Sequence, residues 1–284
     1  MENKMKTQDE ILDKTLKKII IFFKNKQNPY MDIKEFNTLI ETIQSIGFSP
    51  KCEDLGQNGG IQFLIDSLNV KCYPNLNYTD EQNLDLLVSL VVFFQNEKNM
   101  KSFIALDGIQ IVSKMVVDRI ENVRIQQAFL EMMLDLTTDN SQLGGKDSMR
   151  FNWFSAETKK ILRILMANVK FHKNDLSVMT QTFHIMKKLR FNRVSPMQFR
   201  RFLSVMKIHK EDRDLQADGL EICDEILRHD NKKADILFKY GSRYLGMVFM
   251  AMHRFTEDNR IRASGMKILN IVRPLSPVTD ENAL

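Results

Sequence analysis

The sequence predicts an all-α protein built from repeated helical units, and three observations lead to this prediction. Gly and Pro are scarce, clear helix caps precede apolar stripes, and short phrases recur along the chain. The 284 residues include only 11 Gly and 6 Pro, whereas a β-sandwich needs turn residues about every ten positions. The hydrophobic fraction of 43% and the charged fraction of 27% are globular values and exclude global disorder.

Capping boxes mark three predicted helix starts, at residues 7–10 (TQDE), 79–82 (TDEQ) and 195–198 (SPMQ). In each box a Ser or Thr and an acidic or amide residue three positions later satisfy each other's backbone amides. Apolar residues then recur at helical spacing, for example through 176–186 and 199–206. No alternating strand pattern of useful length accompanies them, so the elements are expected to be helices.

The first repeated phrase is Asn-x3-Phe-x3-Asp-Gly-Ile at residues 99–109. Its second half recurs at 55–61 (Leu-x3-Gly-Gly-Ile), 48 residues earlier, and a weaker copy at 231–241 lies 133 residues later. These spacings fit a period of about 44 residues. The phrase is expected to mark the entry to a helix in each repeat.

A second template starts at Thr180, Ala217 and Ala263, with spacings of 37 and 46 residues. Its first and third positions are mostly small, and Gly219 and Gly265 occupy the third position in the last two copies. Small residues let neighbouring helices approach closely, and the apolar residues that follow are expected to bury against the adjacent unit.

The phrase at 99–109, followed by 123–128 (VRIQQA), resembles a unit of the armadillo repeat family. The resemblance is good over 50–140, fair over 211–272 and poor over 141–210, where the glycine entry is missing. It implies a right-handed α-solenoid of roughly five to six helical repeats. An irregular helical bundle with partly coincidental repeats is the alternative.

One helical-repeat domain is expected over residues 1–272. The stretch 140–153 interrupts the pattern and is interpreted as a long loop between repeats, or as a hinge between two sub-arrays. Pro274 and Pro277 stop the last helix, so residues 273–284 are expected to form a flexible tail.

Nothing in the sequence supports catalysis, a cofactor or a metal site. The 3 Cys form no CxxC pair, the 5 His are scattered, and Gly145-Lys146 lacks the other residues of a phosphate loop. The polar, acid-containing start is no signal peptide, and the apolar run at 19–23 is too short for a membrane span. The chain is therefore expected to be a cytoplasmic, non-enzymatic protein.

Charge is distributed unevenly along the chain. The net charge is −5 over residues 1–157, +12 over 158–210 and −2 over 211–284, so the total of +5 conceals a basic centre. We call the cations of this centre the basic strip. The candidate protein-binding residues of the strip are Lys159, Lys160, Arg163, Lys170, Lys187, Lys188, Arg190, Arg193, Arg200, Arg201 and Lys207.

The spacing of polar residues predicts where the strip points. A stripe from Ser177 to Lys188 lies opposite the Met and Phe face of one predicted helix, and Arg200 and Lys207 lie opposite the Phe face of the next. Stacked repeats would merge such stripes into a continuous surface. The alternative is a solvated face whose charges are balanced in space by the acidic flanking regions.

An acidic protein surface or peptide is the predicted partner of the strip. Armadillo relatives bind peptides along a groove of third helices, and many serve as cytoskeletal or signalling adaptors, so a tubulin-like surface in a cytoskeletal or ciliary setting would fit. The single Trp does not match the repeated Trp of nuclear-import receptors. Two alternatives stay open: a nucleic-acid-binding protein that uses the same strip, and a regulatory subunit of a kinase or ATPase.

Overall fold

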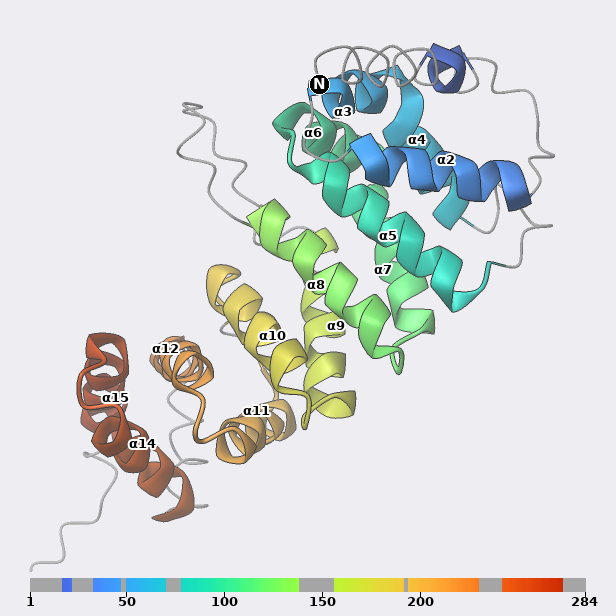
Figure 1. Ribbon diagram of the computed structural model, residues 1–284. Coiled ribbons are helices and arrows are strands. Elements are labelled where there is room, and N and C mark those ends of the chain that lie inside the picture. Colours follow the sequence, from blue (N-terminus) through green and yellow to red (C-terminus); the bar gives the residue numbers. More distant parts are fainter. Residues whose placement is uncertain are drawn as a thin grey trace, which may run out of the picture. The chain divides into compact units, whose positions relative to one another are not determined.

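The structure is a computed structural model that describes residues 17–21, 33–46, 50–69, 78–137, 156–191, 194–229 and 242–272. Within these ranges every regular element is helical and no strand occurs, which confirms the all-α prediction (Figure 1). The main helices are α2 (Ile33–Ile46), α3 (Pro50–Leu55), the π-helical turn η1 (Gly56–Gly60), α4 (Ile61–Leu68), α5 (Asp80–Phe94), α6 (Glu97–Ala105), α7 (Gly108–Asp118), α8 (Val123–Thr137), α9 (Ala156–Phe171), α10 (Leu176–Lys188), α11 (Pro196–Ile208), α12 (Arg213–His229), α14 (Ser242–Arg254) and α15 (Asn259–Val272).

The chain forms two compact units, unit 1 over Met1–Thr138 and unit 2 over Asp139–Leu284. The predicted loop or hinge at 140–153 and the predicted tail at 273–284 lie outside the described residues, as does the capping box at 7–10. The prediction of one domain over 1–272, and of a solenoid of five to six repeats, stays a prediction.

Unit 1 contains two successive three-helix groups, α3–α4–α5 and α6–α7–α8. Helix α5 packs against both α2 and α8, and α4 packs against α7. The capping box predicted at 79–82 is present: the Thr79 hydroxyl accepts from the amide of Gln82, whose side chain accepts from the amide of Thr79. This cap fixes the start of α5, which carries much of the core of unit 1.

The two glycine-bearing phrases of unit 1 adopt the same backbone. Gly59 has φ 111° and Asp107, its counterpart 48 residues later, has φ 57°, so both lie in the left-handed region that favours glycine. At the next position a side chain on Gly108 would place its Cβ 2.3 Å from the ring of Phe103. The third copy, at 231–241, lies outside the described residues.

Unit 2 contains the helical hairpins α9–α10, α11–α12 and α14–α15. Helix α12 packs against both α10 and α15, and we call these three helices the α12 row. Helices α9 and α11 pack against each other, and we call them the α9–α11 layer. Phe183 of α10 stacks on Phe202 of α11, with their ring centroids 4.3 Å apart, and joins the row to the layer.

The same turn precedes the last helix of each hairpin. Asn122, Asp175, Asp212 and Asp258 each accept a hydrogen bond from the backbone amide three residues later, over 3.2, 3.0, 2.8 and 3.3 Å. The amide of each residue also donates to the carbonyl three residues earlier, over 2.8 to 3.1 Å. We call these four residues the turn caps, because they satisfy amides that a helix start leaves without partners.

A glutamine four residues beyond the cap locks two of these turns. Nε2 of Gln126 donates to the carbonyls of Val116 and Arg119 at 3.1 and 3.2 Å. Nε2 of Gln216 makes the equivalent bonds at 2.7 and 3.1 Å to carbonyls at the end of α11. One local design therefore recurs in both units.

The small residues of the second template allow close helix packing, as predicted. A Cβ on Gly219 would lie 2.7 Å from the terminal methyl of Met206, and one on Gly265 would lie 2.4 Å from the sulfur of Met252. In both hairpins the second helix therefore approaches the first at the same register position.

Candidate protein-binding surface

The structure divides the basic strip between different helices. Arg193 lies outside the described residues. The others lie on α9 (Lys159, Lys160, Arg163 and Lys170), on α10 or directly after it (Lys187, Lys188 and Arg190), and on α11 (Arg200, Arg201 and Lys207). Most of the strip thus belongs to the α9–α11 layer.

The cations of the α9–α11 layer are aligned and accessible. Lys159, Arg163 and Lys170 share one face of α9, because their spacing of four and seven residues returns to the same side of a helix. Arg200 and Lys207 share a face of α11 for the same reason. All five side chains are exposed, as the spacing predicts for α11.

Four of these cations make no ion pair with any carboxylate that the structure describes: Lys159, Arg163, Lys170 and Lys207. The ammonium of Lys170 lies 4.5 Å from the centroid of the Phe171 ring. No described carboxylate neutralises their charge, in contrast to that of Arg254 and Arg260 in the last hairpin.

Those arginines are engaged with carboxylates inside unit 2. Arg254 lies 2.8 Å from Glu211, and Arg260 lies 3.1 Å from Asp214. These pairs lie outside the basic centre of residues 158–210, so the alternative that acidic flanking regions balance the strip stays open.

The α10 members of the strip have a different environment. The ammonium of Lys187 donates to Asp218 on α12 and lies 3.6 Å from Glu221. In the predicted stripe from Ser177 to Lys188 only Ser177 is exposed, since α12 covers the rest of that side of α10. Lys187 is therefore engaged inside unit 2, and its role in binding a partner stays a prediction.

Asp218 is the centre of a polar network that connects the α12 row. Its side chain is almost completely buried and contacts Nδ1 of His184 at 2.9 Å and Arg260 of α15 at 3.6 Å, in addition to Lys187. Burial alone would raise the pKa of Asp218, but hydrogen bonds from His184 and Lys187 outweigh it and lower that pKa. The ionised carboxylate therefore holds three helices together.

Sequence reasoning missed this network. A signal existed in the spacing of Asp214, Asp218 and Glu221, which places three carboxylates on one face of α12. This network stabilises the packing of α10, α12 and α15, because its donors and acceptors pair with one another inside the α12 row.

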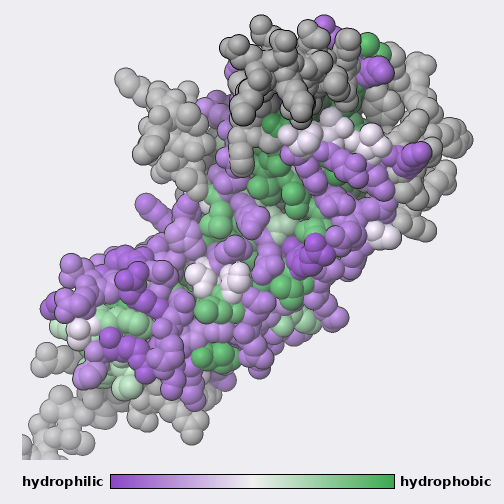
Figure 2. All heavy atoms as spheres, in the orientation of Figure 1, coloured by the Kyte–Doolittle hydropathy of each residue, from purple (hydrophilic) through white to green (hydrophobic). Residues whose placement is uncertain are grey.

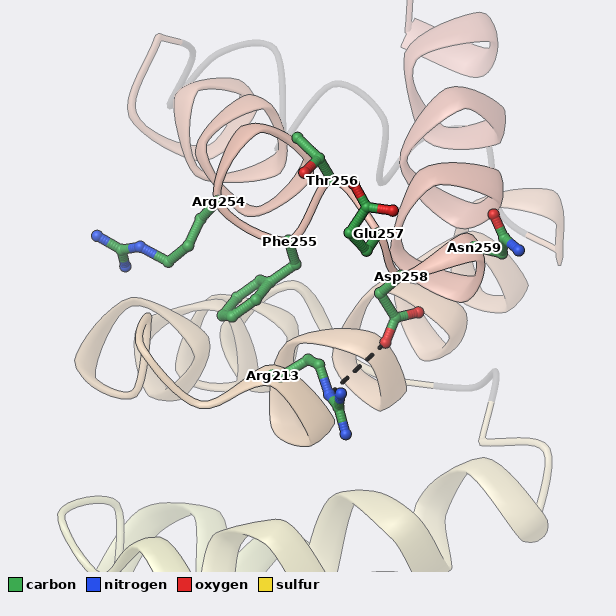
Figure 3. Close-up of a pocket in the computed structure, with 7 residues that line it drawn as sticks. All are labelled: Arg213, Arg254, Phe255, Thr256, Glu257, Asp258 and Asn259. Carbon is green, nitrogen blue, oxygen red and sulfur yellow. Dashed lines mark ion pairs between the residues drawn. The ribbon is translucent and has the colours of Figure 1, made fainter.

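A pocket of about 380 Å³ lies at the turn between α14 and α15. Figure 3 shows Arg213 and Asp258 pointing toward each other across it, with 3.9 Å between their closest atoms, while Arg254 extends away. Asp258 already caps α15, and the rest of the lining combines the ring of Phe255 with polar side chains.

The described residues offer little reactive chemistry. They contain no group of three or more His, Cys, Asp or Glu that could hold a metal ion. Cys52 and Cys223 are buried, and burial raises the pKa of the Cys52 thiol to about 11 and also raises that of Cys223. Neither thiol is activated for nucleophilic attack. Cys72 and Gly145-Lys146 lie outside the described residues.

No family model, no curated protein and no solved structure matches the chain. None of the described helices combines the length and the apolar character that a bilayer crossing needs. The face drawn in Figure 2 is mostly polar, with apolar side chains in separate patches.

Proposed function

We propose that this protein is a non-enzymatic, armadillo-like scaffold that binds an acidic protein surface or peptide through the α9–α11 layer. The observation that carries the proposal is the exposed face of Lys159, Arg163 and Lys170, which meets no described carboxylate. Lys207 extends the same charge onto α11. A cytoskeletal or ciliary setting fits this proposal, because tubulin-like surfaces are acidic.

The armadillo-like part of the proposal rests on local structure. The left-handed residues Gly59 and Asp107 introduce corresponding helices, and the turn caps repeat in every hairpin. These features support a repeat array, in which stacked units display aligned side chains.

The size of the basic face suits a short acidic segment. Along α9, Arg163 lies about 6 Å from Lys159 and about 10 Å from Lys170, so each cation is within about one Debye length of the next at roughly 0.1 M salt. The cations therefore act together on an approaching anion, and they accelerate association in a salt-dependent manner.

A charge-reversal variant tests the proposal. The triple variant Lys159→Glu, Arg163→Glu and Lys170→Glu should bind a fluorescent polyglutamate peptide at least about tenfold more weakly in anisotropy titrations at low salt. The matched control is Lys34→Glu with Lys114→Glu, two exposed lysines of unit 1. Equal affinity of the triple variant and the wild type, with unchanged helical content, would contradict the proposal.

Nucleic-acid binding by the same layer is a second candidate, and Phe171 favours it. The Phe171 side chain is 45% exposed beside Lys170. An exposed aromatic next to a cation is a stacking platform for a base. A single-stranded oligonucleotide that binds more tightly than polyglutamate of equal charge, and loses affinity in Phe171→Ala, would favour this function instead.

A further inference from the structure

The α14–α15 hairpin leaves apolar side chains uncovered at positions that are buried in the other hairpins. Eight residues after the turn cap, Leu130, Phe183 and Leu220 have 0% exposure, whereas Met266 of α15 is 51% exposed. The same register position thus has a different environment only in α15 among the four capped helices that the structure describes.

The first helix of the hairpin shows the same difference. Nine residues before the turn cap, Met166 of α9 and Leu203 of α11 are buried, whereas Phe249 of α14 is 55% exposed. Its neighbour Met250 is 59% exposed. Two independent register positions, one on each helix of the hairpin, are therefore uncovered together.

The position of α15 in the α12 row explains the exposure. Helix α12 packs against α10 on one side and α15 on the other, but among the described helices of the row α15 packs only against α12. Met266 therefore lies on a side of α15 that no other described helix of the row covers. Exposed apolar side chains that gather on one hairpin mark interaction sites.

Charge indicates which kind of helix fits. Carboxylates of α12 face cations on both neighbouring helices: Asp218 faces Lys187 of α10, and Asp224 lies 3.9 Å from Lys267 of α15. On the uncovered side of α15, Arg262 is exposed and makes no ion pair with a described carboxylate. It lies four residues before Met266, on the same face.

We propose that Phe249, Met250, Arg262 and Met266, which we call the α15 face, bind an amphipathic helix of a partner protein. The bound helix presents apolar side chains to the two methionines and the phenylalanine, and a carboxylate to Arg262. It extends the α12 row as α15 itself extends α12. A second copy of this chain that docks through the same face fits less well, because the α15 face itself offers Arg262 no carboxylate.

A designed peptide tests the proposal on the full chain. The probe is a fluorescent amphipathic peptide of about 18 residues, roughly five helical turns, with Leu on one face and Glu beside it. A Lys version of the same peptide serves as its charge control. We expect the Glu peptide to bind more tightly than the Lys peptide, and Met266→Glu to weaken it at least about tenfold. Arg262→Glu should reverse the preference between the two peptides.

The control variant is Val117→Glu, an equally exposed apolar residue of α7 in unit 1 that lies outside both the α15 face and the α9–α11 layer. It should bind the Glu peptide as the wild type does. Absence of binding, or equal binding by Met266→Glu and Val117→Glu, would overturn the proposal. Self-association in sedimentation velocity that Met266→Glu abolishes would also overturn it, since a second copy would then cover the face. So would binding that appears only after residues 273–284 are removed, because the occupant would be this chain's own segment.

Discussion

Units 1 and 2 share their turn caps but differ in how their helices are held together. Unit 1 enters α4 and α7 through left-handed residues and packs them tightly around Gly60 and Gly108. Unit 2 has two-helix hairpins whose row is connected by the buried carboxylate of Asp218. Both units use close contacts at glycines, and unit 2 adds a buried polar network.

The two units also differ in what they do with their cations. In unit 1, Arg119 and Arg124 pair with carboxylates at the start of α5 at 3.0 and 2.9 Å. In unit 2, Lys187 forms an ion pair with Asp218 of the α12 row, whereas Lys159 and Arg163 of the α9–α11 layer pair with no described carboxylate. The difference teaches that net charge along a sequence overstates the charge a partner meets, because pairing between helices removes part of it.

The largest expected effect breaks the polar network of unit 2. Asp218→Ala leaves Lys187 partly buried without its main partner and should destabilise unit 2 by about 3 kcal/mol. Hydrogen exchange read out by mass spectrometry measures this in α12 separately from α5. The matched control, Asp214→Ala, removes an exposed carboxylate of the same helix and should cost no more than about 0.5 kcal/mol. An equal loss of stability in Asp218→Ala and Asp214→Ala would mean that the buried network stabilises unit 2 no more than an exposed carboxylate does.

A smaller effect tests steric fit in unit 1. Gly108→Ala places a methyl group against the ring of Phe103, which is fully buried, and should cost about 2 kcal/mol. Gly246→Ala in α14 is the control, because a Cβ there has no neighbour within 4 Å. That control should be neutral or stabilising by up to about 1 kcal/mol. Protection of the α7 amides from exchange checks Gly108→Ala, and protection of the α14 amides checks the control. An undisturbed α7 in Gly108→Ala would be inconsistent with steric packing at this entry.

The shared turn predicts matched losses in the two units. Asn122→Ala and Asp212→Ala each remove a turn cap and should each cost about 1 kcal/mol. Thermal unfolding with local exchange data for α8 and α12 provides the measurement. A large loss in one unit and none in the other would show that the two turns are not equivalent.

The smallest effect is a change in pH dependence. The folded-state pKa of Asp218 lies below its usual 3.8, so its stabilising contribution is complete above that value and disappears as pH falls through the folded pKa. Wild-type α12 should therefore lose stability below about pH 4, and Asp218→Asn should lose less over the same range. Parallel stability curves for the two proteins would refute the role of this carboxylate.

Local signals in the sequence predicted much of this structure. The capping boxes at Thr79 and Ser195 form, and Gly219 and Gly265 mark close helix contacts. Each of these features depends on residues that are near in sequence or on a residue too small to obstruct a neighbour. Such features can be read from one chain because backbone geometry alone dictates them.

Contacts between distant residues were not predictable in this way. The helical spacing of α10 placed Lys187 beside the solvated stripe, but Asp218, 31 residues later, holds it against α12. Phe171 lies at the very end of α9 and is exposed. Periodicity gives the orientation of a residue about its own helix, while the identity of the neighbouring helix decides what that orientation means.

A lysine-reactivity footprint tests the central claim most directly. Acylation of Lys159, Lys170 and Lys207 is compared with and without polyglutamate peptide, with Lys98 and Lys101 of unit 1 as internal references. The claim that the α9–α11 layer receives an acidic partner predicts at least about threefold protection of the first three lysines and none of the references. Equal protection of all five lysines, or protection of the references alone, would contradict it.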